Sequence, residues 1–446
     1  MALSPDDAVD AVQELRGVHA QEREALDHVR RYWKGRQALP AVIPRSAPQE
    51  VRRMAQISRV NICDIVVSSL AQSLFVDGYR ASARDDENLP MWEAWQANRL
   101  DRWQSGLHRP ALAYGASYAI VAPGDPQPVI RGVSPRRLTA VYGDDPDWPV
   151  MALERIERDV FRLYDEASVF FVAPDEHGRL SVAESYRHGF GVPPVVRFLD
   201  EVDLDVDDEP EPGWGNDMST DDVVLGQVAP LIPLQDQIDL TTFGLLVAQH
   251  YGAFKQRAIM GWVAEDESQK MAAGASQLWT FPQPPSEIGF HEFAETNLDG
   301  YIESREAALK YAATLSQTPV HELIGELVNL SAEALAAAEA GRDRKVEERK
   351  NGFGESWEQV FQLVGSATGD EVALTAQVRW RDTSARAFGA VVDGLGKLAA
   401  QLGVPPRALW RMIPGVTDTD IREWEALAED GDAFADLRML LERQEA

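Results

Sequence analysis

The chain has 446 residues, enough to bury a large core and to form two or more structural units. Apolar residues make up 45% of it and charged residues 26%, as in ordinary globular proteins. The net charge is −29, which serves solubility and disfavours tight binding to nucleic acid, although residues 1–60 hold ten Lys or Arg against eight Asp or Glu. The single cysteine, Cys63, excludes a disulfide framework and is expected to be buried.

The start of the chain, MALSPDDAVDAV, lacks the basic and apolar regions of a signal peptide. No later run reaches the ~18 apolar residues that span a bilayer, so we expect a protein assembled inside a cell without membrane contact. Ser4 and Pro5 predict instead the N-cap and first turn of a helix over residues 5–34, which Gly35 ends.

Two more helices and a set of short strands are predicted next. The helices cover residues 49–75 and 87–113, where apolar residues recur at helical spacing. The strands, separated by Gly, Pro and Asp turns, are expected to form a mixed sheet and cover residues 116–122, 129–133, 138–142, 150–156, 160–172, 180–186 and 194–198.

Residues 200–222 form an acidic loop with eleven Asp or Glu and no Lys or Arg. Prolines and glycines interrupt it, so we expect a solvated linker that cannot pack a core. Residues 200–208 are the densest carboxylate cluster and the one candidate for a Mg²⁺-dependent nuclease or hydrolase. They lack rigid framing elements, which argues against such a site.

A long helix is predicted from Pro233 to Arg257, roughly 37 Å at about 1.5 Å per residue. Its apolar residues fall on two faces, which fits either a central core helix of a monomer or a helix packed between neighbouring copies. For the second interpretation, the expected subunit contacts are Ile238, Phe243, Leu246 and Tyr251.

The rest of the chain alternates between β and helical patterns. A small β module is predicted over residues 258–297, followed by a helix over 298–313 and a loop with a Thr-Pro pair. Ser331 is a predicted N-cap for an Ala-rich helix that continues to Val364. A strand over 372–380 and helices over 384–402, 407–412, 417–427 and 434–443 complete the chain.

The sequence offers no catalytic or metal-binding motif. His291-Glu292 and His321-Glu322 begin like metalloprotease helices, but neither has a second His four residues later. No phosphate-binding loop and no nucleophile motif occurs. We therefore expect a protein that is not an enzyme and that uses no metal or cofactor.

An ordered series of segments resembles the portal proteins of tailed bacteriophages, siphophage type. The series covers nearly the whole chain and runs RRYWKGRQALP, NICDIVVSSLAQSLFVDGYR, RPALAYGASYAIV, RHGFGVPPVVRF, PLIPLQDQIDLTTFGLLVAQHYGAFKQRAIMG, TPVHELIGELVNLSAEAL, RWRDTSARAFGAVVDGLGKL and VPPRALWRMIPGVT. The resemblance implies a helix-rich α+β fold with an α/β wing, a helical stem, a small β clip and a helical crown.

Carried onto this sequence, the resemblance gives each part a place. The wing would be formed by residues 1–229 together with residues 331–382, and the long helix would lie in the latter range. Residues 230–257 and 298–315 would be the stem helices around a clip over 258–297, and residues 383–446 a short crown. Residues 316–330 would be the tunnel loop near DNA, with His321, Glu322, Glu326 and Asn329 lining the channel. A buried connector with Leu323, Ile324 and Leu327 in the core is the alternative for this loop.

The resemblance also implies a function and partners. A ring of about twelve copies at one capsid vertex would pass double-stranded DNA during packaging and ejection. Because the chain has no ATP motif, the terminase large subunit would supply the energy. A head–tail adaptor and the major capsid or scaffolding protein would be further partners, in a virion assembled in the host cytoplasm. The alternative is another phage assembly protein, such as a minor head or adaptor protein.

Overall fold

The computed structural model describes residues 3–38, 43, 46–80, 89–201, 226–252, 257–260, 289–292, 297–325, 332–370, 372–381, 383, 388–413, 416, 420–421 and 423–428. The chain divides into two compact units. The first comprises Met1–Val328 and Arg344–Trp380, and the second Asn329–Asp343 and Arg381–Ala446.

The first helix, α1 (Pro5–Trp33), agrees with the prediction. Ser4 caps it in a reciprocal arrangement with Asp7, so two backbone N–H groups of the first turn are satisfied. Gly35 follows with φ +60, the left-handed conformation that ends a helix at little steric cost to glycine.

The next two predicted helices are each broken in two. Residues 49–75 form α2 (Gln49–Ile57) and α3 (Ile62–Gln72), because Asn61 caps a new helix by accepting a hydrogen bond from the Asp64 N–H. Residues 87–113 form α4 (Leu89–Ala97) and α5 (Leu100–Tyr114), separated at Arg99, whose φ of 54 is left-handed. Helical spacing alone does not signal either break.

The strands form several antiparallel sheets rather than one mixed sheet. A three-stranded sheet has the order β3-β2-β9, a five-stranded meander runs from β4 to β8, and β1 pairs with β12. The predicted strand over residues 160–172 is split by a turn at Asp165. The bounds are β1 (Val76–Arg80), β2 (Ala116–Ala122), β3 (Val129–Val133), β4 (Leu138–Tyr142), β5 (Pro149–Arg155), β6 (Phe161–Tyr164), β7 (Ser168–Pro174), β8 (Leu180–Arg187), β9 (Val195–Leu199) and β12 (Gln377–Trp380).

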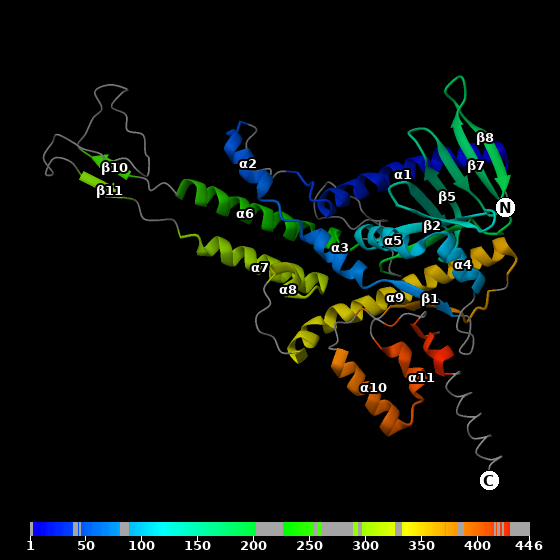
Figure 1. Ribbon diagram of the computed structural model, residues 1–446. Helices are drawn as coiled ribbons and strands as arrows, with labels where there is room; N and C mark the ends of the chain where they lie inside the picture. The colour runs from blue at the N-terminus through cyan, green and yellow to red at the C-terminus, as the bar shows by residue number, and fades with distance from the viewer. Residues whose placement is uncertain are drawn as a thin grey trace, which may run out of the picture. The chain divides into compact units, whose positions relative to one another are not determined.

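The middle of the chain contains a pair of helices joined through a two-stranded ladder. After a short 3₁₀ turn, η1 (Ala229–Leu231), α6 covers Ile232–Gly252. The predicted helix end at Arg257 is wrong, because Arg257 begins the strand β10 (Arg257–Met260), which pairs with β11 (Gly289–Glu292). Then come α7 (Asp299–Ser316), α8 (Val320–Ile324) and the long α9 (Ala332–Thr368). Figure 1 shows α6 and α7 lying side by side.

The second unit is helical in its described part. It contains α10 (Phe388–Leu402), α11 (Pro406–Leu409) and the 3₁₀ turn η3 (Trp410–Met412). Trp410 packs edge-on against Trp424, with ring centroids 5.8 Å apart. Residues 434–443, predicted to be helical, lie outside the described residues.

The main core of the first unit surrounds an aromatic cluster. Trp95, Trp357 and Phe361 are fully buried, and the rings of Trp95 and Trp357 meet with centroids 4.8 Å apart. Inside the cluster, His108 accepts a hydrogen bond from Trp357 Nε1 on its Nε2 and donates from Nδ1 to the Leu74 carbonyl. Burial lowers the pKa of His108 to about 4, so the ring is neutral.

Two smaller cores position the five-stranded sheet. One face packs against the N-terminal half of α1, through Val12 and Leu15, and the other against the three-stranded sheet, through Tyr118 and Ile120. Helices and sheets therefore share one unit, which confirms the predicted helix-rich α+β class.

Candidate functional site: the α6–α7 pair and its surroundings

Polar side chains fix the first turns of α6 to the segment before α3. Asp239 is buried and accepts hydrogen bonds from the Val60 N–H at 3.0 Å and from Gln37 Nε2 at 2.6 Å. Gln235, four residues earlier on the same face, accepts from the Ile62 N–H at 3.1 Å and donates to Asp239. Burial raises the pKa of Asp239, although these donors act in the opposite direction. One face of α6 is thus committed to the interior of the chain.

Small side chains give α7 a flat buried face. Ala308, Ala312 and Ala313 are almost completely buried, together with Leu309. Alanines allow close approach of helix backbones, and α7 contacts α6 along its length and η1 near its end. The two helices run antiparallel, because α6 ends and α7 begins on the side of the β10–β11 ladder (Figure 1).

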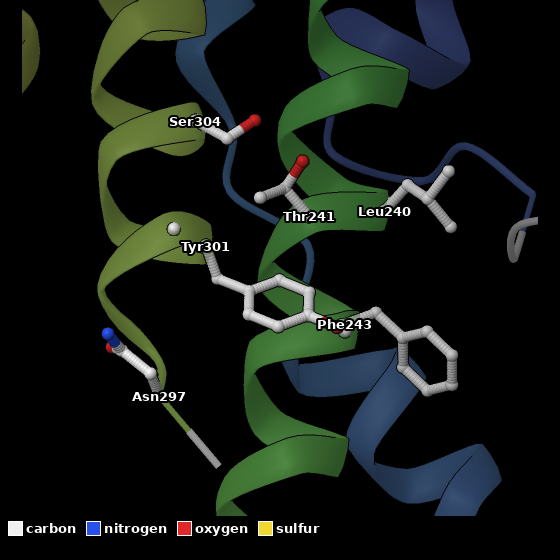
Figure 2. Close-up of a pocket in the computed structure, with 8 residues that line it drawn as sticks. Leu240, Thr241, Phe243, Asn297, Tyr301 and Ser304 are labelled. Atoms are coloured by element: carbon white, nitrogen blue, oxygen red, sulfur yellow. The ribbon is translucent and has the colours of Figure 1, made fainter.

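An open groove of about 740 Å³ lies between α6 and α7 (Figure 2). Figure 2 shows Tyr301 of α7 reaching across toward α6. It crosses at Gly244, where a Cβ atom would come within 2.9 Å of the Tyr301 ring. The groove is lined by Leu240, Thr241, Phe243, Gly244, Asn297, Gly300, Tyr301 and Ser304.

The outer surface of this helical pair carries exposed apolar side chains. Tyr311 is 66% exposed and Leu315 54%, one turn apart on α7. Large exposed apolar side chains in one region mark a contact surface, whereas isolated ones need no explanation. Other exposed apolar residues are Leu240 of α6, Tyr301 and Ile302 of α7 and Val320 of α8.

The structure separates the four residues predicted as subunit contacts. Ile238 is 0% exposed in the main core, so its predicted contact with a neighbouring copy is wrong. Phe243 and Leu246 are half-buried and therefore retain accessible surface. Tyr251 lies at the end of α6. The sequence pattern missed the more exposed apolar residues of α7.

The segment predicted as the tunnel loop is partly helical. α7 ends at Ser316, Gln317 takes a left-handed φ of 55, and α8 then covers Val320–Ile324. His321 and Glu322 lie in α8 and are half-buried. Leu323 and Ile324 pack against the main core, as the buried-connector alternative expects. Glu326, Leu327, Asn329 and the predicted N-cap Ser331 lie outside the described residues.

A buried ionic network ties the end of α7 to α9. Asp200, just after β9, accepts a hydrogen bond from Arg349 Nε of α9 at 3.0 Å and another from Gln227 Nε2. Lys345, one turn before Arg349, donates to Gln227 Oε1 and to the Ser316 carbonyl at the end of α7. Burial raises the pKa of Asp200 and lowers that of Lys345, and each shift is opposed by the neighbouring opposite charge.

This network also fixes the ends of the acidic loop, because Asp200 and Gln227 flank residues 202–225. Asp200, assigned by sequence to a solvated cluster, is in fact buried and paired. A sequence signal was available, since Lys345 and Arg349 are four residues apart on one helical face. In the described ranges, no three His, Cys, Asp or Glu side chains are grouped as metal ligands would be.

Within the described part of the chain, no helix combines the length and the hydropathy needed to cross a bilayer.

The model of the family "Phage portal protein, SPP1 Gp6-like" matches residues 13–432. The portal protein of Mycobacterium phage L5 is 24% identical over 426 residues, covering 86% of this chain and 82% of that protein. The portal protein of Mycobacterium phage D29 is 24% identical over 409 residues, covering 84% and 80% respectively.

Among solved structures, similarity extends to chains of gene transfer agent particles. A chain from the neck of an empty particle aligns with a TM-score of 0.49 and 12% identity, covering 82% of this chain and 92% of that one. A chain from the virion of a native particle aligns with a TM-score of 0.46, 12% identity and the same coverage. Portal proteins are structural components of the phage rather than enzymes. This confirms the prediction that the chain is not an enzyme. Because the family model matches nearly the whole length, this chain belongs to the phage portal protein family of the SPP1 Gp6-like type.

Proposed function

We propose that about twelve copies of this chain close into a ring at one capsid vertex, and that the ring is a channel for double-stranded DNA during packaging and ejection. The observation that carries the proposal is the apolar outer surface of the α6–α7 pair. Tyr311 and Leu315 of α7 stay more than half exposed in the single chain, and burial of such side chains favours association.

The position of this surface favours a ring over a symmetric dimer. Leu240 and Phe243 belong to α6, whereas Tyr311 and Leu315 belong to α7, so two different patches are available on one helical pair. When one patch of a copy meets the other patch of the next, the contact is heterologous and repeats until the ring closes.

The charge of the chain fits a channel through which DNA slides. A protein that neutralises many phosphates binds DNA tightly, whereas a chain with a net charge of −29 repels most of the phosphate backbone. Weak contact over most of the surface allows the duplex to move. His321, Glu322, Glu326 and Asn329 are proposed to lie near its path.

The partners follow from this role. The sequence has no ATP-binding motif, so the terminase large subunit is proposed as the source of energy for packaging. The β10–β11 ladder falls in the predicted clip, where the terminase and later a head–tail adaptor would dock. The ring would be assembled in the host cytoplasm with the major capsid or scaffolding protein and would remain in the virion.

Electron microscopy of the purified protein in negative stain tests the proposal directly. We expect rings with an axial hole, and a mass of about twelve chains by light scattering after size exclusion. A protein that stays monomeric at every concentration and salt condition contradicts it. A two-fold dimer without a hole would also contradict it, because a dimer has no channel.

A further inference from the structure

One short stretch of this acidic chain is strongly basic. Residues 30–59 contain eight Lys or Arg and a single acidic residue, Glu50. This gives the stretch a charge of +7 and leaves −36 on the rest of a chain whose total is −29. The concentration of positive charge is not explained by solubility, which the net negative charge already provides.

Four cations come together where the end of α1 meets α5, and we call them the basic cluster: Arg30, Lys34, Arg36 and Arg109. Trp33 at the end of α1 packs edge-on against Tyr114 at the end of α5, with ring centroids 5.4 Å apart. The Lys34 ammonium lies 3.5 Å from the Trp33 ring centroid. Three of the four side chains are exposed, and Arg30 is half-buried.

In the described part of the chain the basic cluster forms no ion pair, although the Asp64 carboxylate acts on Lys34 from farther away. Among the described residues, no carboxylate oxygen lies within 4.0 Å of the four cationic groups, whereas the buried Arg349 is paired with Asp200 at 3.0 Å. Burial lowers the pKa of Lys34, and Arg109, Arg30 and Arg36 lower it further, although Asp64 acts in the opposite direction. The cations therefore repel one another, and a bound polyanion would relieve that repulsion.

We infer that the basic cluster binds the phosphate backbone of duplex DNA. The inference rests on the proposed function, which brings DNA to this protein. Duplex DNA carries one negative charge per ~1.7 Å of its axis, and a group of Lys and Arg on one face is the usual footprint of its binding. The contact is independent of base sequence. It would place the attractive interaction with DNA at one site of a chain whose remaining negative charge repels phosphate.

The test compares two variants with the same net charge. The cluster variant carries Arg30→Gln, Lys34→Gln, Arg36→Gln and Arg109→Gln. The control carries Arg158→Gln, Arg179→Gln, Arg187→Gln and Lys310→Gln, all at exposed positions away from the cluster. Binding of each full-length protein to a fluorescein-labelled 30-base-pair duplex is measured by anisotropy between about 50 and 200 mM NaCl, the range over which salt weakens binding to phosphates most clearly.

We expect the cluster variant to bind at least about tenfold more weakly at 50 mM NaCl, with a shallower salt dependence. The slope of log K against log[salt] falls by about 0.9 for each phosphate that the protein no longer neutralises, so by up to about 3.6 for four. The control should bind like the wild type. A third variant that exchanges Arg and Lys within the cluster keeps the charge and should restore binding.

Two results would overturn the inference. One is wild-type binding by the cluster variant, and the other is an equal loss in the control. If the cluster variant binds DNA normally but fails to form rings by light scattering, the basic cluster contacts an acidic surface of a second copy instead. Ring formation is measured on the same samples, so rings that bind no DNA refute this contact alone, whereas absence of rings in the wild type refutes the proposed function.

Discussion

Gly244 of α6 lies against the ring of Tyr301 of α7, so closely that a Cβ atom there would come within 2.9 Å of the ring. Glycine within a helix lowers its stability by roughly 0.5–1 kcal/mol relative to alanine. Here the missing side chain lets the tyrosine cross from one helix to the other. The contact fixes the separation of the two helices where their groove opens (Figure 2).

The first prediction concerns this contact. Gly244→Val should displace Tyr301 and lower the thermal unfolding midpoint, because overpacking of a close contact costs about 1–3 kcal/mol. Tyr301→Ala in the same chain should recover part of the loss, since it removes the clash. Differential scanning calorimetry of the two single variants and the double variant measures both effects. Purely additive losses would show that the two side chains do not meet.

The second prediction concerns the apolar surface. Tyr311→Asp with Leu315→Asp should prevent ring formation while the chain stays folded, because charges buried at a subunit contact are unfavourable. Leu246→Asp should act in the same direction. Ala307→Asp, at an exposed alanine of α7, is the control and should assemble normally. Light scattering gives the mass and circular dichroism the fold. Rings formed by the double variant would remove this surface from the subunit contact.

The third prediction concerns the buried network at α9. Arg349→Ala should destabilise the first unit by about 3–5 kcal/mol, because it leaves the buried Asp200 carboxylate without its ion-pair partner. Arg349→Met with Asp200→Leu should lose less, since both charges of the pair are removed and Lys345 keeps its hydrogen bonds to Gln227 and the Ser316 carbonyl. The thermal unfolding midpoints of the two variants, each compared with that of the wild type, measure the two losses of stability. An equal loss in both would mean that packing, and not charge, dominates the site.

The fourth prediction concerns acid stability. The pKa of His108 is about 4 in the folded chain, below the ordinary 6.5, because the ring is buried. A lowered pKa stabilises the fold above pH 6.5, and the contribution disappears as the pH falls from about 6.5 to 4, a loss of roughly 3 kcal/mol. His108→Gln should be less stable at pH 7 but lose less stability between pH 7 and 5. Burial also lowers the pKa of His19 to about 4, so the stability of the variant should still depend in part on pH. Identical pH profiles would refute the role of His108.

The fifth prediction concerns the segment around α8. Glu322→Lys with Glu326→Lys should leave ring assembly intact and reduce DNA packaging, because about two dozen new cations per ring would hold phosphates. The control is Glu176→Lys with Glu184→Lys, at exposed positions of the five-stranded sheet region. Packaging is measured as DNA protected from nuclease. Failed assembly would support the buried connector, and normal packaging would mean that the segment stays clear of DNA.

Local signals in the sequence were sufficient for many elements but not for their breaks. The Ser4 cap, Gly35 and the strands β2, β3 and β4 were predicted because turn residues and alternation mark them directly. The breaks at Asn61 and Arg99 were missed, since the apolar spacing continues across both. The separation into several sheets depends on strand pairing between distant residues, which alternation does not encode.

At the candidate site, too, the helices were predicted from the sequence but their tertiary contacts were not. The long helix and its neighbour were predicted, but not which apolar face of α6 is buried within the chain. Ile238 and Phe243 look alike in the sequence, and only the hydrogen bonds of Gln235 and Asp239 show which side faces inward. The buried position of Asp200 was missed for the same reason, because its partner Arg349 is 149 residues away.

Cys63, the one cysteine of the chain, is completely buried in α3, and its Sγ lies 3.8 Å from Gln235 Oε1 of α6. Burial, together with the nearby Asp239, raises the pKa of the thiol to about 12, so the folded protein presents almost no thiolate at neutral pH. A maleimide dye will therefore not react with Cys63 in the folded protein, and it will label a single cysteine introduced on the surface. Conversely, modification of Cys63 itself will report the moment at which α3 and α6 separate.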